Sequence, residues 1–283
     1  MKQLNAVYSA RLARLTAAPR HLSGTLREYN DRTGDYVHRF REPQVISVDL
    51  SGGVPCPRWR RIHPAPALAD LLWQLSETAD LSWLNRHAPY IWGPYVENGL
   101  LPRAYGLRYV WQLPTLIEHL ISDPSSRQAY LGIWHSQDDM ADGPRSPMPP
   151  CPVGMHFRVR QRGNLTLDAT LVLRSSDIMI GLPHDLMTFG MLLTLVARAT
   201  NYRVGRLHMT LLDLHLYAGH RTIAQSMLRQ DWLPPIALET PSLIIGDVYR
   251  MTWSDMDATV IACRGRYQDA VLAAPYYMMD VPR

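Results

Sequence analysis

The chain has 283 residues, of which 47% are apolar and 19% are charged, with a formal net charge of +4 and a pI near 9.0. This composition excludes a disordered or fibrous protein and predicts one folded domain over residues 1–283. The basic residues form no run of five or more, which argues against a nucleic-acid-binding tail. A clustered charge of +4 would still suit a small phosphate-bearing ligand.

Hydrophobic periodicity predicts the elements of the first part of the chain. Residues 5–18 carry apolar positions at helical spacing, and residues 30–34 form a polar loop. Residues 44–50 alternate as a strand does. The basic stretch 52–64 is typical of a loop, and residues 66–75 place four leucines on one helix face.

The second part of the chain interleaves strands and helices. A strand at 129–134 precedes a polar loop at 136–150, which we prefer to a domain boundary because a hairpin follows it. The remaining predicted elements are hairpin strands 156–161 and 165–173, helix 186–200, strand 206–217 and helix 220–232. This interleaving predicts one α/β (α+β) domain with a mixed sheet.

The cysteines are Cys56, Cys151 and Cys263. An odd, sparse set without zinc-ligand spacing favours a reducing compartment and no metal site. The N-terminus lacks a signal-peptide core, and the longest apolar stretch is too short to span a bilayer. We therefore expect a soluble cytoplasmic protein without a membrane partner.

Cys151 follows two prolines at a loop-to-strand junction. A free cysteine is often a small buried hydrophobe, but a thiol on a rigid approach also suits a nucleophile if a nearby cation lowers its pKa. The segment Arg174–Asp177 follows a strand, and its Arg and Ser donors suit an anion site; a solvated turn is the alternative. His215 and Tyr217 lie on one strand face, as half-buried polar residues or as donors to a sugar hydroxyl.

Six motifs occur in order along the chain. They are N-D-R-T-G at 30–34, the tract 91–106, D-P-S-S-R at 123–127, P-C at 150–151, R-S-S-D-I-M-I-G-L-P at 174–183 and D-L-H-L-Y at 213–217. Over residues 27–220 this series resembles the thymidylate synthase superfamily. The resemblance implies a single catalytic domain with a mixed sheet packed against helices, a homodimer formed through a sheet face, and active sites at the subunit interface.

The resemblance also implies a reaction. The acceptor is a pyrimidine nucleoside monophosphate and the one-carbon donor is 5,10-methylenetetrahydrofolate, with no metal and no nucleic acid required. It assigns the following residues by motif: Cys151 as nucleophile with Tyr105 nearby; Arg32, Arg174 and Ser175 on the phosphate, with Arg127 reaching across the dimer; His215 and Tyr217 on the sugar hydroxyl; and Trp92, Tyr95, Asp177 and Gly181 in the folate pocket.

Several positions depart from the family pattern. His184-Asp185 stands where the synthases have Phe-Asn, and the base-reading residue is therefore Asp185. Asp70 replaces the usual Glu, Tyr95 replaces a tryptophan, and the C-terminus does not match the short apolar tail that seals the folate site. A carboxylate accepts from the N4 amino group of cytosine, and one shared proton joins it to N3. Asp185 is typical of the cytidylate hydroxymethylases of phages and of nucleoside-antibiotic pathways.

We therefore interpret the sequence as a CMP or dCMP 5-hydroxymethylase, in a bacterial or phage-infected cytoplasm. The lack of a match to the family's tail, together with Tyr95 and Asp70, permits a wetter pocket, in which water rather than hydride reaches the one-carbon unit. Asp70 would position this water or relay protons. One alternative is reductive methylation of dUMP or dCMP. The other is a catalytically silent member that binds a nucleotide or RNA.

Overall fold

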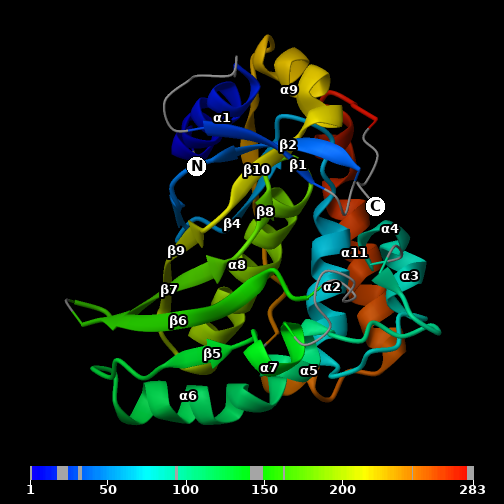
Figure 1. The fold of residues 1–283 in the computed structure, drawn as a ribbon. Helices are drawn as coiled ribbons and strands as arrows, with labels where there is room; N and C mark the ends of the chain where they lie inside the picture. The colour runs from blue at the N-terminus through cyan, green and yellow to red at the C-terminus, as the bar shows by residue number, and fades with distance from the viewer. Residues whose placement is uncertain are drawn as a thin grey trace.

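A computed structural model describes residues 2–17, 25–30, 34–92, 95–140, 149–161, 163–243 and 245–278 (Figure 1). Its helices are α1 (Lys2–Thr16), α2 (Pro64–Leu75), α3 (Leu84–His87), α4 (Pro89–Trp92), α5 (Tyr105–Tyr109), α6 (Leu113–Ser122), α7 (Ser136–Asp139), α8 (Gly181–Ala199), α9 (Arg221–Leu228), α10 (Ile245–Val248) and α11 (Trp253–Leu272), with short 3-10 helices η2 (Val110–Gln112) and η4 (Ala218–His220). Its strands are β1 (Thr25–Asn30), β2 (Asp35–Phe40), β3 (Gln44–Asp49), β4 (Val54–Arg58), β5 (Tyr130–Gly132), β6 (Pro152–Arg160), β7 (Thr166–Leu173), β8 (Ser176–Asp177), β9 (Arg203–Leu211), β10 (Leu214–Tyr217) and β11 (Leu233–Leu238). This arrangement confirms the expected mixed α/β architecture.

The largest sheet has the strand order β3-β9-β7-β6-β5 and is mixed, because β7 and β9 run parallel while the other neighbours are antiparallel. Its side chains alternate between two faces. In β9, Leu207, Met209 and Leu211 are buried, whereas the residues between them are partly buried. The buried face packs against α8, which lies behind the sheet in Figure 1 and also contacts α2.

A second sheet has the order β1-β2-β10-β8, and its short parallel ladder positions part of the site. In that ladder His215 of β10 lies opposite Asp177 of β8. The ladder places a histidine and a carboxylate from different segments at neighbouring positions. A third, two-stranded sheet pairs β4 with β11, so the predicted loop 52–64 is wrong over Val54–Arg58.

The single strand predicted over 206–217 is also wrong. The chain turns at residues 212–213, where Leu212 N donates to Leu173 O, and continues as β10 in the other sheet. The turn contains no glycine or proline, but the adjacent apolar residues Leu211 and Leu212 interrupt the alternation, and this was the signal of the break. The helix predicted at 220–232 ends earlier, at Leu228, because the chain next enters β11.

Two helices carry the central packing of the site. The helix expected at 66–75 begins at Pro64, where the side chain of His63 accepts from Ala65 N and caps the helix. The helix expected at 186–200 begins at Gly181, with Pro183 in its first turn. α11 was not predicted, and it packs along α2 (Figure 1).

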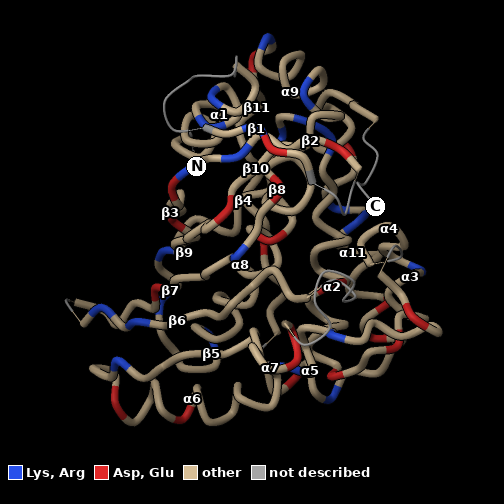
Figure 2. The backbone as a smooth tube through the Cα atoms, viewed as in Figure 1, with Lys and Arg blue, Asp and Glu red and all other residues tan. Residues whose placement is uncertain are grey.

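Charged positions are interspersed over both ends of the molecule, with Lys and Arg beside Asp and Glu on many elements (Figure 2). This distribution agrees with the absence of a basic run in the sequence. In the part of the chain that the structure describes, no helix is both long enough and apolar enough to cross a bilayer.

Candidate active site

A cavity of about 370 Å³ lies where α2, α4, α5, α8, β8 and β10 converge with the residue that precedes β6. Most of the residues singled out from the sequence line it together: Asp70, Trp92, Tyr95, Tyr105, Cys151, Ser175, Asp177, Gly181, His184, Asp185, His215 and Tyr217. These residues are spread over nearly 150 positions of the chain. The fold therefore gathers the predicted site into one space.

Cys151 lies on a backbone segment that is held at several points. Its N–H donates to the hydroxyl of Tyr105 at 3.3 Å, and its carbonyl accepts from Arg174 N at 2.9 Å. The guanidinium of Arg174 donates to Pro150 O at 2.9 Å and to Pro149 O at 2.8 Å. One residue thus holds three consecutive carbonyls, and the thiol is presented to the cavity from a fixed backbone.

Asp70 is the centre of a buried hydrogen-bond network on α2. Its Oδ1 accepts from Trp92 Nε1 at 2.7 Å and its Oδ2 accepts from Gln74 Nε2 at 2.8 Å, one helical turn away. Gln74 in turn accepts from the Tyr109 hydroxyl at 3.1 Å. Each carboxylate oxygen receives one short N–H bond, and together the two bonds fix the orientation of the carboxylate.

Asp185 and Tyr105 line the same cavity, and both have raised pKa values. Burial raises the pKa of Asp185 to about 7, with the Asp70 carboxylate adding to the rise and His184 opposing it. Burial, and then the negative charges of Cys151 and Asp185, raise the pKa of Tyr105 well above its usual range. The nucleophile candidate and the base-reading candidate are therefore electrostatic neighbours of the same phenol.

His184 lies between the two carboxylates. Its Nε2 is 3.6 Å from Asp70 Oδ2, and this nitrogen is buried without a hydrogen-bond partner. Buried polar atoms in native proteins are nearly always paired, so an orphaned ring nitrogen next to a carboxylate calls for an explanation. The residue itself precedes Asp185 on the first turn of α8.

The opposite end of the cavity is formed by the second sheet. The rings of His215 and Tyr217 stand almost perpendicular, with centroids 5.1 Å apart, and His215 Nδ1 is 3.2 Å from Asp213 O. Asp177 accepts from Met179 N at 2.9 Å, which fixes its carboxylate at the start of the turn before α8.

Two predicted phosphate ligands, Arg127 and Arg174, do not line this cavity, and a third cannot be placed. Arg32 lies outside the described residues. Arg174 is directed at the carbonyls before Cys151, and its guanidinium carbon lies 5.4 Å from the centre of the Trp134 ring. Arg127 is exposed in a separate depression beside β6, which His156 and Arg158 also line. Within one subunit, Arg127 and Cys151 therefore belong to different surfaces.

The sequence interpretation missed other lining residues. Arg60 and Arg61 belong to the basic stretch that we took for a loop, and Arg60 donates to Met179 O at 2.7 Å. Burial lowers the pKa of Arg60. Gln74 was overlooked, although its place four residues after Asp70 on a predicted helix was a usable signal.

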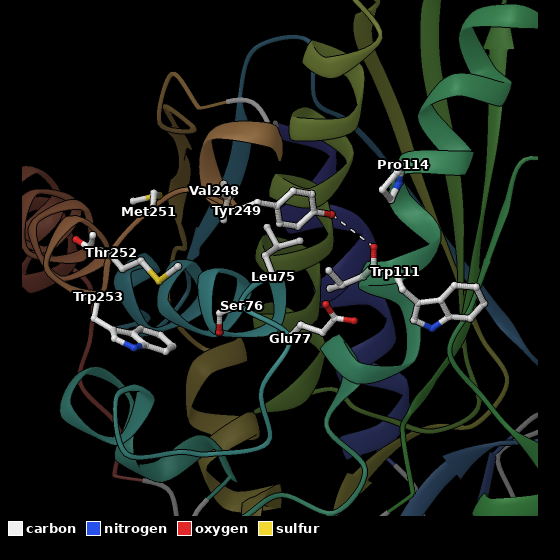
Figure 3. Close-up of a pocket in the computed structure, with 12 residues that line it drawn as sticks. Leu75, Ser76, Glu77, Trp111, Pro114, Val248, Tyr249, Met251, Thr252 and Trp253 are labelled. Carbon is white, nitrogen blue, oxygen red and sulfur yellow. Dashed lines mark hydrogen bonds between the residues drawn. The ribbon is translucent and has the colours of Figure 1, made fainter.

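A second cavity of about 770 Å³ opens at the C-terminal end of α2 (Figure 3). Trp111, Tyr249 and Trp253 stand around its rim, and Tyr249 donates to Val110 O at 3.5 Å. Among the described residues that line it, Glu77 is the only charged one. Among the described residues, no cysteine or histidine lines this cavity.

Among the described residues, no group of three or more His, Cys, Asp or Glu side chains is arranged to hold a metal ion. A family model described as thymidylate synthase matches residues 20–263 of the 283. The match spans the cavity's segments from α2 to β10.

Proposed function

Because the chain belongs to the thymidylate synthase family, we propose that it transfers a one-carbon unit from 5,10-methylenetetrahydrofolate to C5 of CMP or dCMP and forms the 5-hydroxymethyl nucleotide. Folate-dependent one-carbon transfer to a pyrimidine nucleotide follows from the family. The choice of cytosine and of water as the final reactant is our proposal.

The environment of Asp185 carries the proposal. Cytosine offers an N4 amino donor and an N3 acceptor, so its partner needs one acceptor and one donor side by side. A carboxyl group with a pKa of about 7 is half protonated at pH 7. Such a group shares one proton with N3 and accepts from N4 on its other oxygen, whereas its ionised form has no donor for the O4 of uracil.

Cys151 is the proposed nucleophile. Its thiolate adds to C6 of the ring, which makes C5 nucleophilic toward the one-carbon unit. Tyr105 supports this step by accepting from the N–H of Cys151, and Arg174 by holding the three carbonyls of the segment. A thiol on a fixed backbone meets C6 with little loss of freedom at the moment of attack.

Ser175 and the rings of His215 and Tyr217 suit the phosphate and the sugar, because they line the same cavity as Cys151. Arg174 and Arg32 are proposed phosphate ligands from the motifs alone. We also propose that the protein is a homodimer that donates Arg127 to the partner's nucleotide. The exposure of Arg127 and its separation from the cavity of its own subunit support this arrangement.

The residues proposed for the folate pocket fit a flat aromatic group. The rings of Trp92 and Tyr95 lie 6.5 Å apart at the cavity wall. A Cβ added at Gly181 would meet only Asp185 Oδ2 within 4 Å, at 3.9 Å, so the glycine leaves open space there. Asp177 adds a carboxylate to the same wall. The folate supplies the one-carbon unit when bound.

A panel of CMP, dCMP, UMP and dUMP with methylenetetrahydrofolate tests the proposal. Mass spectrometry should detect a hydroxymethyl product from a cytidylate, without the absorbance change that accompanies dihydrofolate. A methyl product with dihydrofolate would establish a reductive methylase instead. No release of tritium from C5-labelled nucleotides would establish a catalytically silent member that binds a nucleotide or RNA.

A further inference from the structure

The buried ring nitrogen of His184 lies near a carboxylate that can explain it. Asp70 Oδ2 lies 3.6 Å away, slightly beyond hydrogen-bond distance, on a carboxylate fixed by Trp92 and Gln74. A small shift of the imidazole closes this gap. The network around Asp70 therefore presents an acceptor to one side of the ring.

This acceptor selects a tautomer. Asp70 Oδ2 presents an acceptor to this side of the ring, so the neutral imidazole turns its Nε2–H toward Asp70. The lone pair is then on Nδ1. The His184 side chain lines the cavity and is 21% exposed, whereas Nε2 is buried. Nδ1 is the ring nitrogen left for water or a ligand.

We propose that Asp70 and His184 form a dyad in which His184 exchanges a proton with the reacting water and Asp70 positions its ring. This inference rests on the proposed hydroxymethylation. In this dyad Asp70 orients the imidazole of His184, and the imidazole, not Asp70, contacts the reacting water. A shorter acidic side chain suits that role, because the imidazole spans the remaining distance.

The step balances as follows. The cytosine ring is bound to Cys151 at C6 and carries an exocyclic methylene at C5. The water oxygen bonds to the methylene carbon while His184 Nδ1 takes one water proton. The methylene π electrons form the C5–C6 double bond, and the C6–S bond breaks to release the Cys151 thiolate. The products are the hydroxymethyl nucleotide, a free thiolate and a protonated imidazole, which then returns its proton to solvent.

Other titratable groups line the same cavity. They include Asp185 on α8 beside His184, Tyr105 on α5, Cys151 before β6, Asp177 in β8, His215 on β10 and Arg60 after β4. The raised pKa of Asp185 means that this neighbour titrates near neutral pH. A test of the dyad must therefore separate His184 from Asp185.

Nitrogen-15 NMR of histidine-labelled protein provides a test that does not depend on turnover. The His184 signal is assigned as the one that is lost in His184→Phe. In the wild type, the neutral His184 ring should carry its proton on Nε2. The Asp70→Asn variant should shift the tautomer toward Nδ1–H. A neutral ring protonated on Nδ1 in the wild type would overturn the dyad.

Single-turnover kinetics provide the second test. His184→Phe keeps a ring of similar size and should slow hydroxymethyl formation by about 10²–10⁴-fold, the usual contribution of a proton-transfer group. Release of tritium from C5 should persist for one turnover, and an adduct on Cys151 should accumulate and be detected by mass spectrometry of the denatured protein. Asp70→Glu should retain more activity than Asp70→Asn, because it keeps a carboxylate.

The proposal would be overturned if His184→Phe showed the same pH dependence of kcat as the wild type and accumulated no adduct on Cys151. Failure of the proposed function has a different signature. A wild type that yields no hydroxymethyl nucleotide from any of the four substrates would leave the Nε2–H tautomer in place. The NMR result and the product analysis therefore fail independently.

Discussion

Two cavities are lined by successive parts of one helix and the residues after it. Asp70 and Gln74 of α2 line the inner cavity, and the next residues, Leu75 to Glu77, line the outer one. The outer cavity has about twice the volume, 770 Å³ against 370 Å³. Size therefore does not mark the reactive site in this protein.

The difference between them is in how their polar groups are arranged. In the inner cavity, Asp70, Asp185 and Cys151 act on the same phenol, Tyr105. In the outer cavity, burial and then Glu77 raise the pKa of Tyr249 to about 12, but no thiol or imidazole lines that space among the described residues. Converging titratable groups, rather than open volume, indicate where chemistry occurs.

Removal of the inner cavity's thiol should have the largest effect. Cys151→Ala should lower product formation and C5 tritium release by about 10⁴–10⁶-fold, because the covalent bond to C6 cannot form. Nucleotide affinity, measured by calorimetry, should change little, since the phosphate and sugar contacts remain. Normal turnover would show that another group is the nucleophile.

Exchange of the base-reading carboxyl should alter which nucleotide reacts. Asp185→Asn should lose most cytidylate activity and gain uridylate activity, because an amide accepts from N3–H and donates to O4. A site that reads such a pattern discriminates by up to about 10⁴–10⁵-fold in kcat/KM. His184→Phe in the same chain would complete the exchange if the imidazole disfavours the amide. An unchanged preference would refute cytosine reading by Asp185.

The inner cavity is also expected to be incomplete within one subunit. Arg127→Ala should weaken nucleotide binding by about 10–100-fold, the usual cost of a lost charged hydrogen bond. Arg229→Ala, which removes an exposed cation at the end of α9, provides the control.

Mixing Arg127→Ala with Cys151→Ala subunits tests the exchange directly. Heterodimers that hold one intact site should recover part of the wild-type activity. Heterodimers that form, as verified by native mass spectrometry, but remain inactive would contradict the shared site.

The titration of Asp185 predicts a pH dependence confined to the inner cavity. Its pKa is raised to about 7, so the carboxyl proton that faces N3 is present below this value and lost above it. Cytidylate affinity should then fall by up to about tenfold per pH unit above pH 7. Asp185→Asn should remove this dependence. A flat profile in the wild type would indicate that the proton comes from elsewhere.

The outer cavity should give the smallest effects. Trp111→Ala and Glu77→Gln change exposed side chains, and we expect kcat/KM to stay within about twofold of the wild type and unfolding free energy within about 0.5 kcal/mol. A tenfold loss of activity in either variant would abolish the distinction between the two cavities.

The sequence motifs identified most of the inner cavity, because the fold brings residues of separate motifs to one place. The turn at 212–213 was missed because it has no glycine or proline, although the adjacent Leu211 and Leu212 interrupt the period-two pattern there. The long helix α11 was not predicted because its apolar positions do not form one stripe: Val260 is buried and Ile261 is exposed.

Arg127 and Arg174 show a different limit. Their motifs predict phosphate ligands, but residue type does not reveal which carbonyls or which subunit a guanidinium faces. In the structure, the guanidinium of Arg174 donates to carbonyls of the loop before Cys151, and Arg127 lies on a separate surface. Such placements depend on tertiary packing and assembly, which local patterns do not contain.

The hydrogen bonds from Arg174 to the carbonyls of Pro149, Pro150 and Cys151 have a consequence for the entropy of the reaction. Fixing the backbone of one residue costs about 1–2 kcal/mol of conformational entropy. Here that cost falls on folding, before any nucleotide arrives. An electrophilic inhibitor directed at Cys151 would meet a thiol whose backbone is already ordered, and its covalent step would lose mainly its own freedom of motion.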